Sequence, residues 1–291
     1  MKLLIIGQEE RTPTDLEILN RAKRFFDSTL YVPFSRLSMN VDGKVIYKRV
    51  DFNKFDAILP RISPNKKMFA YSILKALNLY SPISAYTYLI TYNRFVMLEI
   101  LNKKNIPTIK AYLLNSSKSF SGLDISYPVS VRVPNKKGVM LANNRIELKP
   151  IIDALESEEP IHIEEIWLEN YTQAYVVGDE VFGIKRRPKE ISDILFGKGK
   201  PSECKLKPHI REIALRAAIA LRTEFARVDI LKDRVLNVEL TPSIKKVEEI
   251  INKSIIDKLL LLIRDSVSKR RESIFDKLID EVRSAFGDVF K

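Results

Sequence analysis

Residues 226–243, with the sequence ARVDILKDRVLNVELTPS, form the pattern that most constrains how this chain can fold. Aliphatic residues alternate with other residues in two short runs, and Lys232 to Arg234 separate the runs. Alternation with a period of two is typical of strands, and so short a connection is typical of an antiparallel hairpin. We therefore expect strands over 226–231 and 235–241 that pair with each other.

Three polar side chains, Asp229, Asn237 and Glu239, stand among the aliphatic residues of this hairpin. The period of two places all three on the face opposite the aliphatic residues. Asp229 then lies near Asn237 across the ladder, at roughly 5 Å between opposed residues. Two carboxylates and a carboxamide at this spacing are suitable ligands for a magnesium ion that carries the phosphates of a nucleotide. The alternative interpretation is a solvated polar face of an amphipathic sheet, and the pattern alone favours neither.

Composition places the chain among globular proteins. Its 291 residues are 45% hydrophobic, which is enough for one large core or several small ones. The longest aliphatic run, 259–263, is far shorter than the roughly 20 residues of a membrane-spanning helix. The N-terminal segment MKLLIIGQEE becomes polar too early for a signal peptide. We therefore expect a cytoplasmic protein with no membrane segment.

The net charge and the few cysteine and histidine residues limit which ligands and metal sites the chain can have. A net charge of +12 predicts a surface that attracts nucleic acid, nucleotide phosphates or an acidic protein. The single cysteine, Cys204, excludes an internal disulfide, and the two histidines have no cysteine partners for a structural zinc site. We expect both His162 and His209 to be structural or solvated. A charged fraction of 30% with only two glutamines is typical of heat-adapted proteins, and predicts a thermophilic source.

The first 85 residues alternate strands and helices. KLLIIG, at 2–7, is typical of a buried strand. The segment 12–26 has the spacing of an amphipathic helix that begins with a capping box from Thr14 to Glu17. This order predicts a small α/β unit with a parallel sheet. Its other predicted elements are strands over 29–34 and 55–62 and a helix over 65–81.

Strands dominate the middle of the chain, and helices follow. The Gly178-Asp179 step predicts the turn of a hairpin over 173–187. A helix over 209–225 is expected to precede the hairpin of 226–243. The other predicted elements are helices over 85–106, 146–157, 244–263 and 266–286, and strands over 108–114, 128–133 and 138–142.

This order of elements resembles the ATP-grasp ligases of the RimK-like branch, which are ATP-dependent carboxylate–amine ligases. The resemblance includes a strand near FDAILPRI at 55–62, a helix with a pattern like YNRFVMLEILNKKNIPT at 92–108, and a hairpin that ends in basic residues. The family's magnesium hairpin reads roughly VDIL…EVNSTPG, and VDILKDRVLNVELTPS at 228–243 fits it without gaps.

The resemblance implies a fold of the α/β (α+β) class, the ATP-grasp fold, with a small N-terminal parallel α/β domain and a helical C-terminal extension. It also implies ATP and magnesium as the bound groups. The implied divisions are a pre-ATP-grasp α/β domain at 1–85, a central subdomain at 86–163, a C-terminal subdomain with the metal hairpin at 164–250 and the helical extension at 251–291.

Metal and nucleotide positions are carried over residue by residue. Asp229 matches the first metal ligand of the family, while Asn237 and Glu239 fall on the family's Glu and Asn positions in exchanged order. Because Asn and Glu are only exchanged in order, the same oxygen ligands stay on the same face of the hairpin.

The segment IEEIWLEN resembles the connection between the two ATP-grasp subdomains. The backbone at Glu165, Ile166 and Trp167 would then meet adenine, and Glu169 would bind the ribose. An ordinary exposed strand edge is the alternative interpretation of Glu164, Glu165 and Glu169.

Basic residues fall where the family binds phosphate. Lys185 and Arg186, in GIKRR, match catalytic positions that meet the γ-phosphate or an acyl-phosphate, and an ordinary basic strand end is the alternative. Arg94 and Arg132 stand where the family has two phosphate-binding lysines. Because the planar fork of arginine differs from a lysine ammonium, the phosphate geometry must differ from that of the family.

Other positions depart further from the family. The flap PNKKGVML, at 134–141, has one glycine in place of several, and Lys136 and Lys137 are expected to compensate on the phosphates. Gln173 replaces an arginine, and FGKGKP at 196–201 replaces an Asn-plus-Gly-Gly substrate loop.

The implied reaction joins a carboxylate to an amine through an acyl-phosphate, with an amino acid, a peptide or an acidic carrier protein as substrate. Two other classes remain open. The first is a catalytically degenerate ATP-grasp protein that binds nucleotide or a partner. The second is a nucleic-acid-binding protein, which the lack of interleaved basic and aromatic motifs argues against. The C-terminal helices either cover the core or form the interface of a homo-oligomer.

Overall fold

The computed structural model describes residues 1–62, 66–132, 138–155 and 160–287, with side chains described as far as Ser273. These residues form two compact units. The first unit contains residues 1–85 and 243–245 and the chain from Ser254 onward. The second unit contains residues 86–242 and 246–253.

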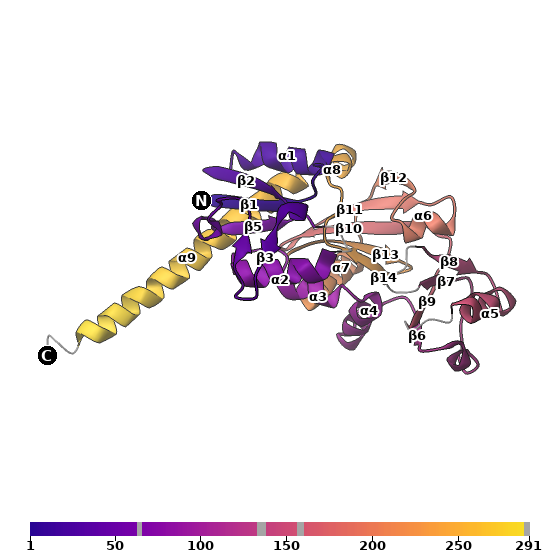
Figure 1. The fold of residues 1–291 in the computed structure, drawn as a ribbon. Coiled ribbons are helices and arrows are strands. Elements are labelled where there is room, and N and C mark those ends of the chain that lie inside the picture. The colour runs from indigo at the N-terminus through magenta and orange to yellow at the C-terminus, as the bar shows by residue number, and fades with distance from the viewer. Residues whose placement is uncertain (63–65, 133–137, 156–159, 288–291) are drawn as a thin grey trace. The chain divides into compact units, whose positions relative to one another are not determined.

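The first unit is built on a parallel sheet of three strands in the order β2-β1-β5. This arrangement confirms the parallel sheet that the sequence predicts, and Figure 1 shows its strands side by side. The central strand β1 is paired on both edges, and its residues Leu3–Ile6 are fully buried. The elements are β1 (Lys2–Gly7), α1 (Pro13–Ala22), β2 (Ser28–Pro33), η1 (Phe34–Arg36), β3 (Ser38–Met39), β4 (Val45–Ile46), η2 (Phe52–Lys54), β5 (Ala57–Pro60) and α2 (Lys67–Leu77).

Helix α1 begins earlier than the sequence interpretation placed it. The capping box joins Thr12 and Asp15, not Thr14 and Glu17. Pro13 explains the difference, because proline is favoured at the first helical position and fixes the cap on the residue before it. The hydroxyl of Thr14 instead accepts hydrogen bonds from the backbone N–H groups of Ile244 and Lys245.

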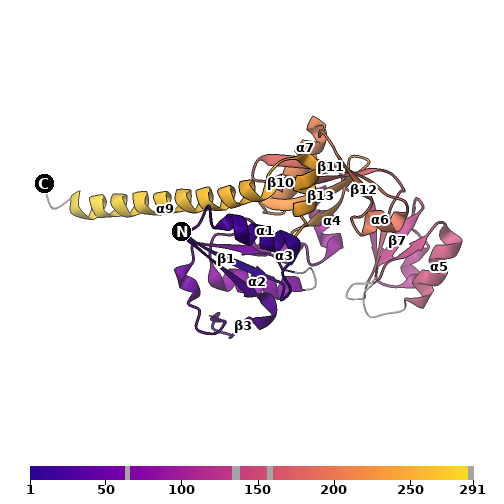
Figure 2. The same ribbon diagram turned by 90° about the horizontal axis from the view of Figure 1, so that it is seen from above.

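The C-terminal helices also differ from the prediction. α8 (Lys245–Ile251) is short, and α9 (Ile255–Gly287) is a single continuous helix in both Figure 1 and Figure 2. The predicted break near 264–265 is wrong, since neither Arg264 nor Asp265 disfavours a helix interior as strongly as glycine or proline. α9 packs against α1, and its buried side chains include Leu259, Leu260, Ile263 and Val267.

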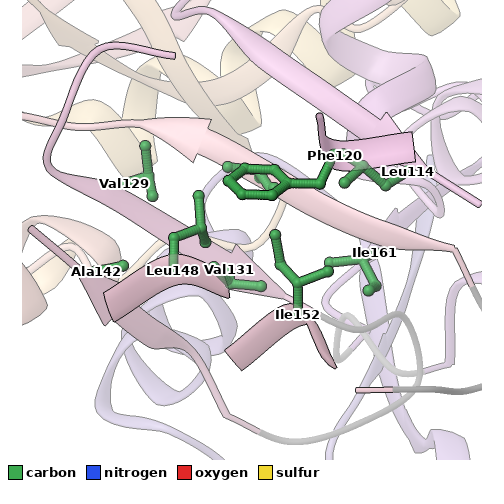
Figure 3. Close-up of a cluster of buried hydrophobic side chains, with 9 residues drawn as sticks. Leu114, Phe120, Val129, Val131, Ala142, Leu148, Ile152 and Ile161 are labelled. Atoms are coloured by element: carbon green, nitrogen blue, oxygen red, sulfur yellow. The ribbon is translucent and has the colours of Figure 1, made fainter. Parts of the chain in front are cut away.

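In the second unit, an antiparallel sheet has the strand order β6-β9-β7-β8. One face packs against α5 and η4 through the apolar cluster of Figure 3. Ser130, Arg132, His162 and Glu164 alternate with residues of that cluster and therefore belong to the other face. The elements are β6 (Ala111–Leu114), η4 (Ser117–Phe120), β7 (Val129–Arg132), β8 (Met140–Ala142), α5 (Arg145–Ala154) and β9 (Ile161–Glu165).

The second sheet of this unit has five antiparallel strands in the order β12-β11-β10-β13-β14. The hairpin of β10 and β11 turns at Gly178-Asp179, which confirms the prediction. Helix α7 packs against β10 and β13. The elements are β10 (Tyr171–Val177), β11 (Glu180–Arg187), α6 (Ile191–Leu195), β12 (Lys200–Glu203), α7 (Pro208–Ala220), β13 (Phe225–Leu231) and β14 (Arg234–Glu239).

The predicted helix over 85–106 is two helices, α3 (Ala85–Ile90) and α4 (Arg94–Lys103). Asn93 causes the break, because its side chain accepts hydrogen bonds from the N–H groups of Phe95 and Val96 and so caps a new helix. Within the described ranges, every helix is too short or too polar to span a bilayer.

Candidate functional site

The hairpin of β13 and β14 brings the three predicted oxygen ligands to one face of the five-stranded sheet. Asp229 lies opposite Asn237, and Arg227 lies opposite Glu239, before an irregularity shifts the register at Ile230. The shared face confirms the expectation from alternation. Arg227 belongs to the same face, and the sequence interpretation missed it although it precedes Asp229 by two residues.

Arg227 and Asp229 form a bidentate ion pair. Arg227 Nε donates to Asp229 Oδ1 at 2.8 Å, and Nη2 donates to Oδ2 at 2.9 Å. Burial lowers the pKa of Arg227, but the charge and hydrogen bonds of Asp229 outweigh burial and raise that pKa above its ordinary value. The carboxylate is only 1% exposed, so a charged guanidinium group neutralises it inside the protein.

Arg94, the first residue of α4, joins the two sheets of the second unit. Its Nη2 donates to Glu164 Oε2 at 3.0 Å and to the carbonyl oxygen of Leu236 at 2.6 Å, and its Nε donates to Glu164 Oε1. Its Nη1 donates to Asn237 Oδ1 at 2.7 Å. The guanidinium group therefore connects β9 to β14, and protein oxygens engage all three of its nitrogens.

Glu164 is fully buried in a mostly cationic environment. Arg132 Nε lies 3.9 Å from its Oε2, and His162 Nε2 lies 3.5 Å from its Oε1. Burial raises the pKa of Glu164, but Arg94, His162 and Arg132 outweigh burial, so this pKa lies below its ordinary value. Glu164 is therefore a carboxylate at neutral pH.

Around Glu164, three buried polar atoms have no hydrogen-bond partner among the residues that the structure describes: Ser130 Oγ, Arg132 Nε and His162 Nε2. Burial, with the charges of Arg94 and Arg132, lowers the pKa of His162 to about 4 despite Glu164, so the imidazole is neutral at pH 7. Burial and Arg94 lower the pKa of Arg132 to about 10, which leaves its guanidinium charged. Unpartnered donors and acceptors of this kind are suited to a polar ligand.

Arg186 belongs to the same face of the five-stranded sheet as Gln173. Its Nε donates to Gln173 Oε1 at 2.8 Å, and its Nη1 donates to the carbonyl oxygen of Gly199 at 3.1 Å. Lys185 is exposed and, as the adjacent strand residue, belongs to the opposite face. The structure thus brings Arg186, but not Lys185, to the face that carries Arg227.

The predicted adenine and ribose segment is held by other protein groups. The N–H groups of Glu165 and Ile166 donate to the carbonyl oxygens of Lys110 and Pro128, each at 3.0 Å. The Glu165 carboxylate accepts from Tyr112 and from the N–H of Ser126. Burial, together with Glu165, raises the pKa of Tyr112 to about 12.

Lys232, in the turn of the β13–β14 hairpin, contacts the other two residues of this segment. Its Nζ lies 5.0 Å from the centre of the Trp167 ring and 2.8 Å from Glu169 Oε1. Glu169 therefore has a cationic partner at the position predicted to bind ribose. Lys137, expected on the phosphates, lies outside the described residues.

Magnesium fits this donor set by chemistry but not by arrangement. Both oxygens of Asp229 accept from Arg227, and the oxygen of Asn237 accepts from Arg94. Among the residues that the structure describes, no group of three His, Cys, Asp or Glu side chains could hold a metal ion. The oxygen atoms of Asp229 and Asn237 that would bind the metal therefore already bind guanidinium groups, and Glu239 Oε1 accepts from the hydroxyl of Thr241.

Comparison with known families identifies the chain. A family model of the RimK-like ATP-grasp domain matches residues 91–263, which is more than half of the chain. The chain belongs to the RimK-like ATP-grasp family. This confirms the resemblance that the sequence shows, and the two sheets of the second unit lie within the matched residues.

Relatives of this RimK-like chain extend over nearly its whole length. A probable alpha-L-glutamate ligase of Picosynechococcus is 25% identical over 272 residues, which cover 86% of this chain and 90% of the relative. A probable alpha-L-glutamate ligase of Nitrosococcus oceani is 23% identical and covers 93% of this chain and 98% of the relative.

Solved structures confirm the ATP-grasp fold of this RimK-like chain. The ATP-grasp ligase PsnB, complexed with a minimal precursor, has a TM-score of 0.68 at 14% identity and covers 90% of this chain and 98% of PsnB. D-alanine–D-alanine ligase of Bacillus anthracis, complexed with ATP, has a TM-score of 0.60 at 15% identity, covering 94% of this chain and 99% of that enzyme.

Proposed function

We propose that this chain is an ATP-dependent ligase that joins a carboxylate to an amine through an acyl-phosphate. Membership of the RimK-like family supports ligase chemistry. The observation that carries the proposal is the arginine cluster, Arg94, Arg132, Arg186 and Arg227, on two sheet faces that Arg94 connects. Clustered guanidinium groups bind phosphate oxygens strongly.

We assign the phosphate chain of ATP to Arg132 and Arg186. Among the described residues, Arg132 Nε has no hydrogen-bond partner and only a 3.9 Å ion pair with Glu164, so it can donate to a phosphate oxygen without losing a protein hydrogen bond. Arg186 is held by Gln173 and Gly199, which fix its planar group.

The adenine would lie at the segment Glu165–Trp167. Because the N–H groups of Glu165 and Ile166 are engaged, we assign recognition to the remaining groups of this segment, including the Trp167 ring. Glu169 would accept a ribose hydroxyl while Lys232 holds its carboxylate.

The chemistry proceeds in two balanced steps. An oxygen of the substrate carboxylate attacks the γ-phosphorus, the bond to the β–γ bridging oxygen breaks, and ADP leaves. The amine nitrogen then attacks the acyl carbon, inorganic phosphate leaves with the electron pair of the C–O bond, and the amine loses a proton. The arginines stabilise negative charge as it moves onto the phosphate oxygens in both steps.

An acidic substrate suits this chain best. Its net charge of +12 attracts carboxylate-rich molecules. The curated relatives are named as probable glutamate ligases, and PsnB is complexed with a minimal precursor. We therefore propose an amino acid, such as glutamate, or an acidic peptide or carrier protein as the substrate.

A second candidate is a nucleotide-binding relative without ligase activity. It is favoured by one observation: two of the predicted metal ligands already bind guanidinium groups, Asp229 that of Arg227 and Asn237 that of Arg94. ADP release measured with ATP, glutamate and acidic peptides separates the candidates. Release that depends on both a carboxylate and an amine supports the ligase, whereas ATP binding without such release across the panel would support the second candidate.

A further inference from the structure

Asp229 has an intramolecular cation where a metal-binding family member would place a divalent ion. The fork of Arg227 contacts both carboxylate oxygens, at 2.8 and 2.9 Å. A divalent ion on Asp229 would lie only a few ångströms from this guanidinium group, and the two cations would repel each other strongly in a buried site. The single negative charge of Asp229 is already neutralised.

Packing holds Arg227 in this position. Its side chain is 14% exposed. Gly197 lies so close that a Cβ there would be 2.9 Å from Arg227 Nη2. Because the pair is buried and bidentate, swinging Arg227 away would leave Asp229 as an uncompensated buried charge.

Asn237 cannot replace Asp229 as the first ligand. Its oxygen accepts from Arg94 at 2.7 Å, and its nitrogen lies 3.5 Å from Asp229 Oδ2, facing the carboxylate as a donor. Amide nitrogen does not bind magnesium, so the side of Asn237 nearest to Asp229 carries no metal ligand. The hydroxyl of Thr241 donates to Glu239 Oε1, so the third side chain also has a protein partner.

We propose that the guanidinium group of Arg227 takes the place of a divalent cation, and that this site binds the phosphate chain of ATP or ADP without a metal ion. The inference rests on the proposed nucleotide site, which is common to both candidate functions. The inference concerns which cation neutralises the phosphates at that site.

The chemistry of arginine suits this role. A guanidinium group has five N–H bonds; the ion pair with Asp229 uses two of them, and a side-chain hydrogen bond to Tyr175 uses another. The group can therefore bridge a carboxylate and a phosphate, as a metal ion does, while its charge stays fixed in the protein. Arg132 and Arg186 supply further positive charge on the faces that Arg94 joins.

Nucleotide affinity with and without metal tests the proposal. We would titrate the full chain with ADP and with a non-hydrolysable ATP analogue by calorimetry, in excess EDTA or in excess magnesium. The wild type is expected to bind in both conditions, with affinities that differ by less than about threefold. Arg227→Met is expected to bind about 10 to 100 times more weakly in EDTA, because the bridging cation is lost and Asp229 then repels phosphate.

Magnesium should restore binding by Arg227→Met, because the vacated Asp229 can then hold the ion. The double variant Arg227→Met/Asp229→Asn removes both charges, avoids the unpaired carboxylate and should show weak binding that magnesium does not restore. Arg187→Met, an exposed residue of β11, is the matched control for the loss of one arginine and should behave as the wild type.

The outcomes separate this inference from the proposed nucleotide site. Wild-type binding that requires magnesium would overturn the inference and leave the nucleotide site standing. Absence of binding in both conditions would overturn both. Thermal unfolding tests the inference without nucleotide. Magnesium should raise the Tm of Arg227→Met but not that of the wild type. If magnesium raises the Tm of the wild type and Asp229→Asn abolishes that rise, the inference is contradicted.

Discussion

Arg94 at the start of α4 and Glu164 on β9 form a two-point ion pair across 70 residues of sequence, and Arg94 extends the contact to β14. Arg94→Met is expected to lower the free energy of unfolding by about 3 kcal/mol, because it leaves a fully buried carboxylate without its main partner. Urea unfolding of both proteins measures this difference.

The double variant Arg94→Met/Glu164→Gln tests the cause of that loss. It should be more stable than Arg94→Met alone, because no buried charge remains. Lys103→Met is the control, since it breaks an exposed ion pair with Glu99 in the same helix and should change stability by less than about 0.5 kcal/mol. Equal losses for Arg94→Met and Lys103→Met would contradict the assignment.

Local patterns predicted the pairing of β13 with β14 and its polar face well, because a period of two is set by backbone geometry. The opposition of Asp229 and Asn237 follows from alternation and a short turn alone. The same rule places Arg227 on their face, so the sequence contained the signal for this residue too. Its bidentate contact with Asp229 was not predictable, because rotamers and burial decide which neighbours on one face meet.

Long-range partners lay beyond any local pattern. The sequence predicted Arg94 as a phosphate-binding residue from its place in a motif, but Glu164 becomes its partner only when two sheets come together. The division of 85–106 into two helices was in principle visible, because Asn93 is a favoured cap residue before an apolar helix. Pro13 likewise signalled the earlier start of α1.

The buried His162 should make stability depend on pH. Its pKa is about 4 in the folded protein, against about 6.5 in an unfolded chain, so the unfolded state binds more protons between these values. The free energy of unfolding is therefore expected to fall as pH falls from 6.5 towards 4, by about 2 to 3 kcal/mol in total. Denaturant titrations across this range should find a smaller slope in His162→Gln. His209→Gln changes a half-exposed ring and is the control; the same slope in His162→Gln and the wild type would refute the prediction.

Gly197 should be intolerant of a side chain. Its φ of +68° disfavours other residues, and a Cβ would lie 2.9 Å from Arg227 Nη2. Gly197→Ala is expected to lower stability by about 1 to 2 kcal/mol and to weaken nucleotide binding by displacing Arg227. Gly122→Ala is the matched control, because nothing lies within 4 Å of the added methyl group. The prediction fails if the two variants have the same Tm.

The corrected cap of α1 can be tested separately from the site. Thr12 accepts a hydrogen bond from the N–H of Asp15, so Thr12→Ala should cost about 1 kcal/mol of unfolding free energy. Glu17→Ala, at the position that the sequence first suggested, removes only an ion pair with Arg21 on the helix surface and should cost less than about 0.5 kcal/mol. A larger loss for Glu17→Ala in thermal unfolding would restore the original assignment.

The assignment of Arg186 to the phosphates of ATP can be tested by enzyme kinetics. Gln173 and Gly199 hold its guanidinium group in place, and a preorganised cation stabilises the charge that develops in the transition state. Arg186→Met is therefore expected to lower kcat for carboxylate- and amine-dependent ADP release by about 100-fold. Arg187→Met removes the same charge from the adjacent, exposed position and should retain activity. Since nonspecific attraction of ATP to a basic surface would affect both variants alike, equal losses would mean that Arg186 does not contact the transferred phosphate.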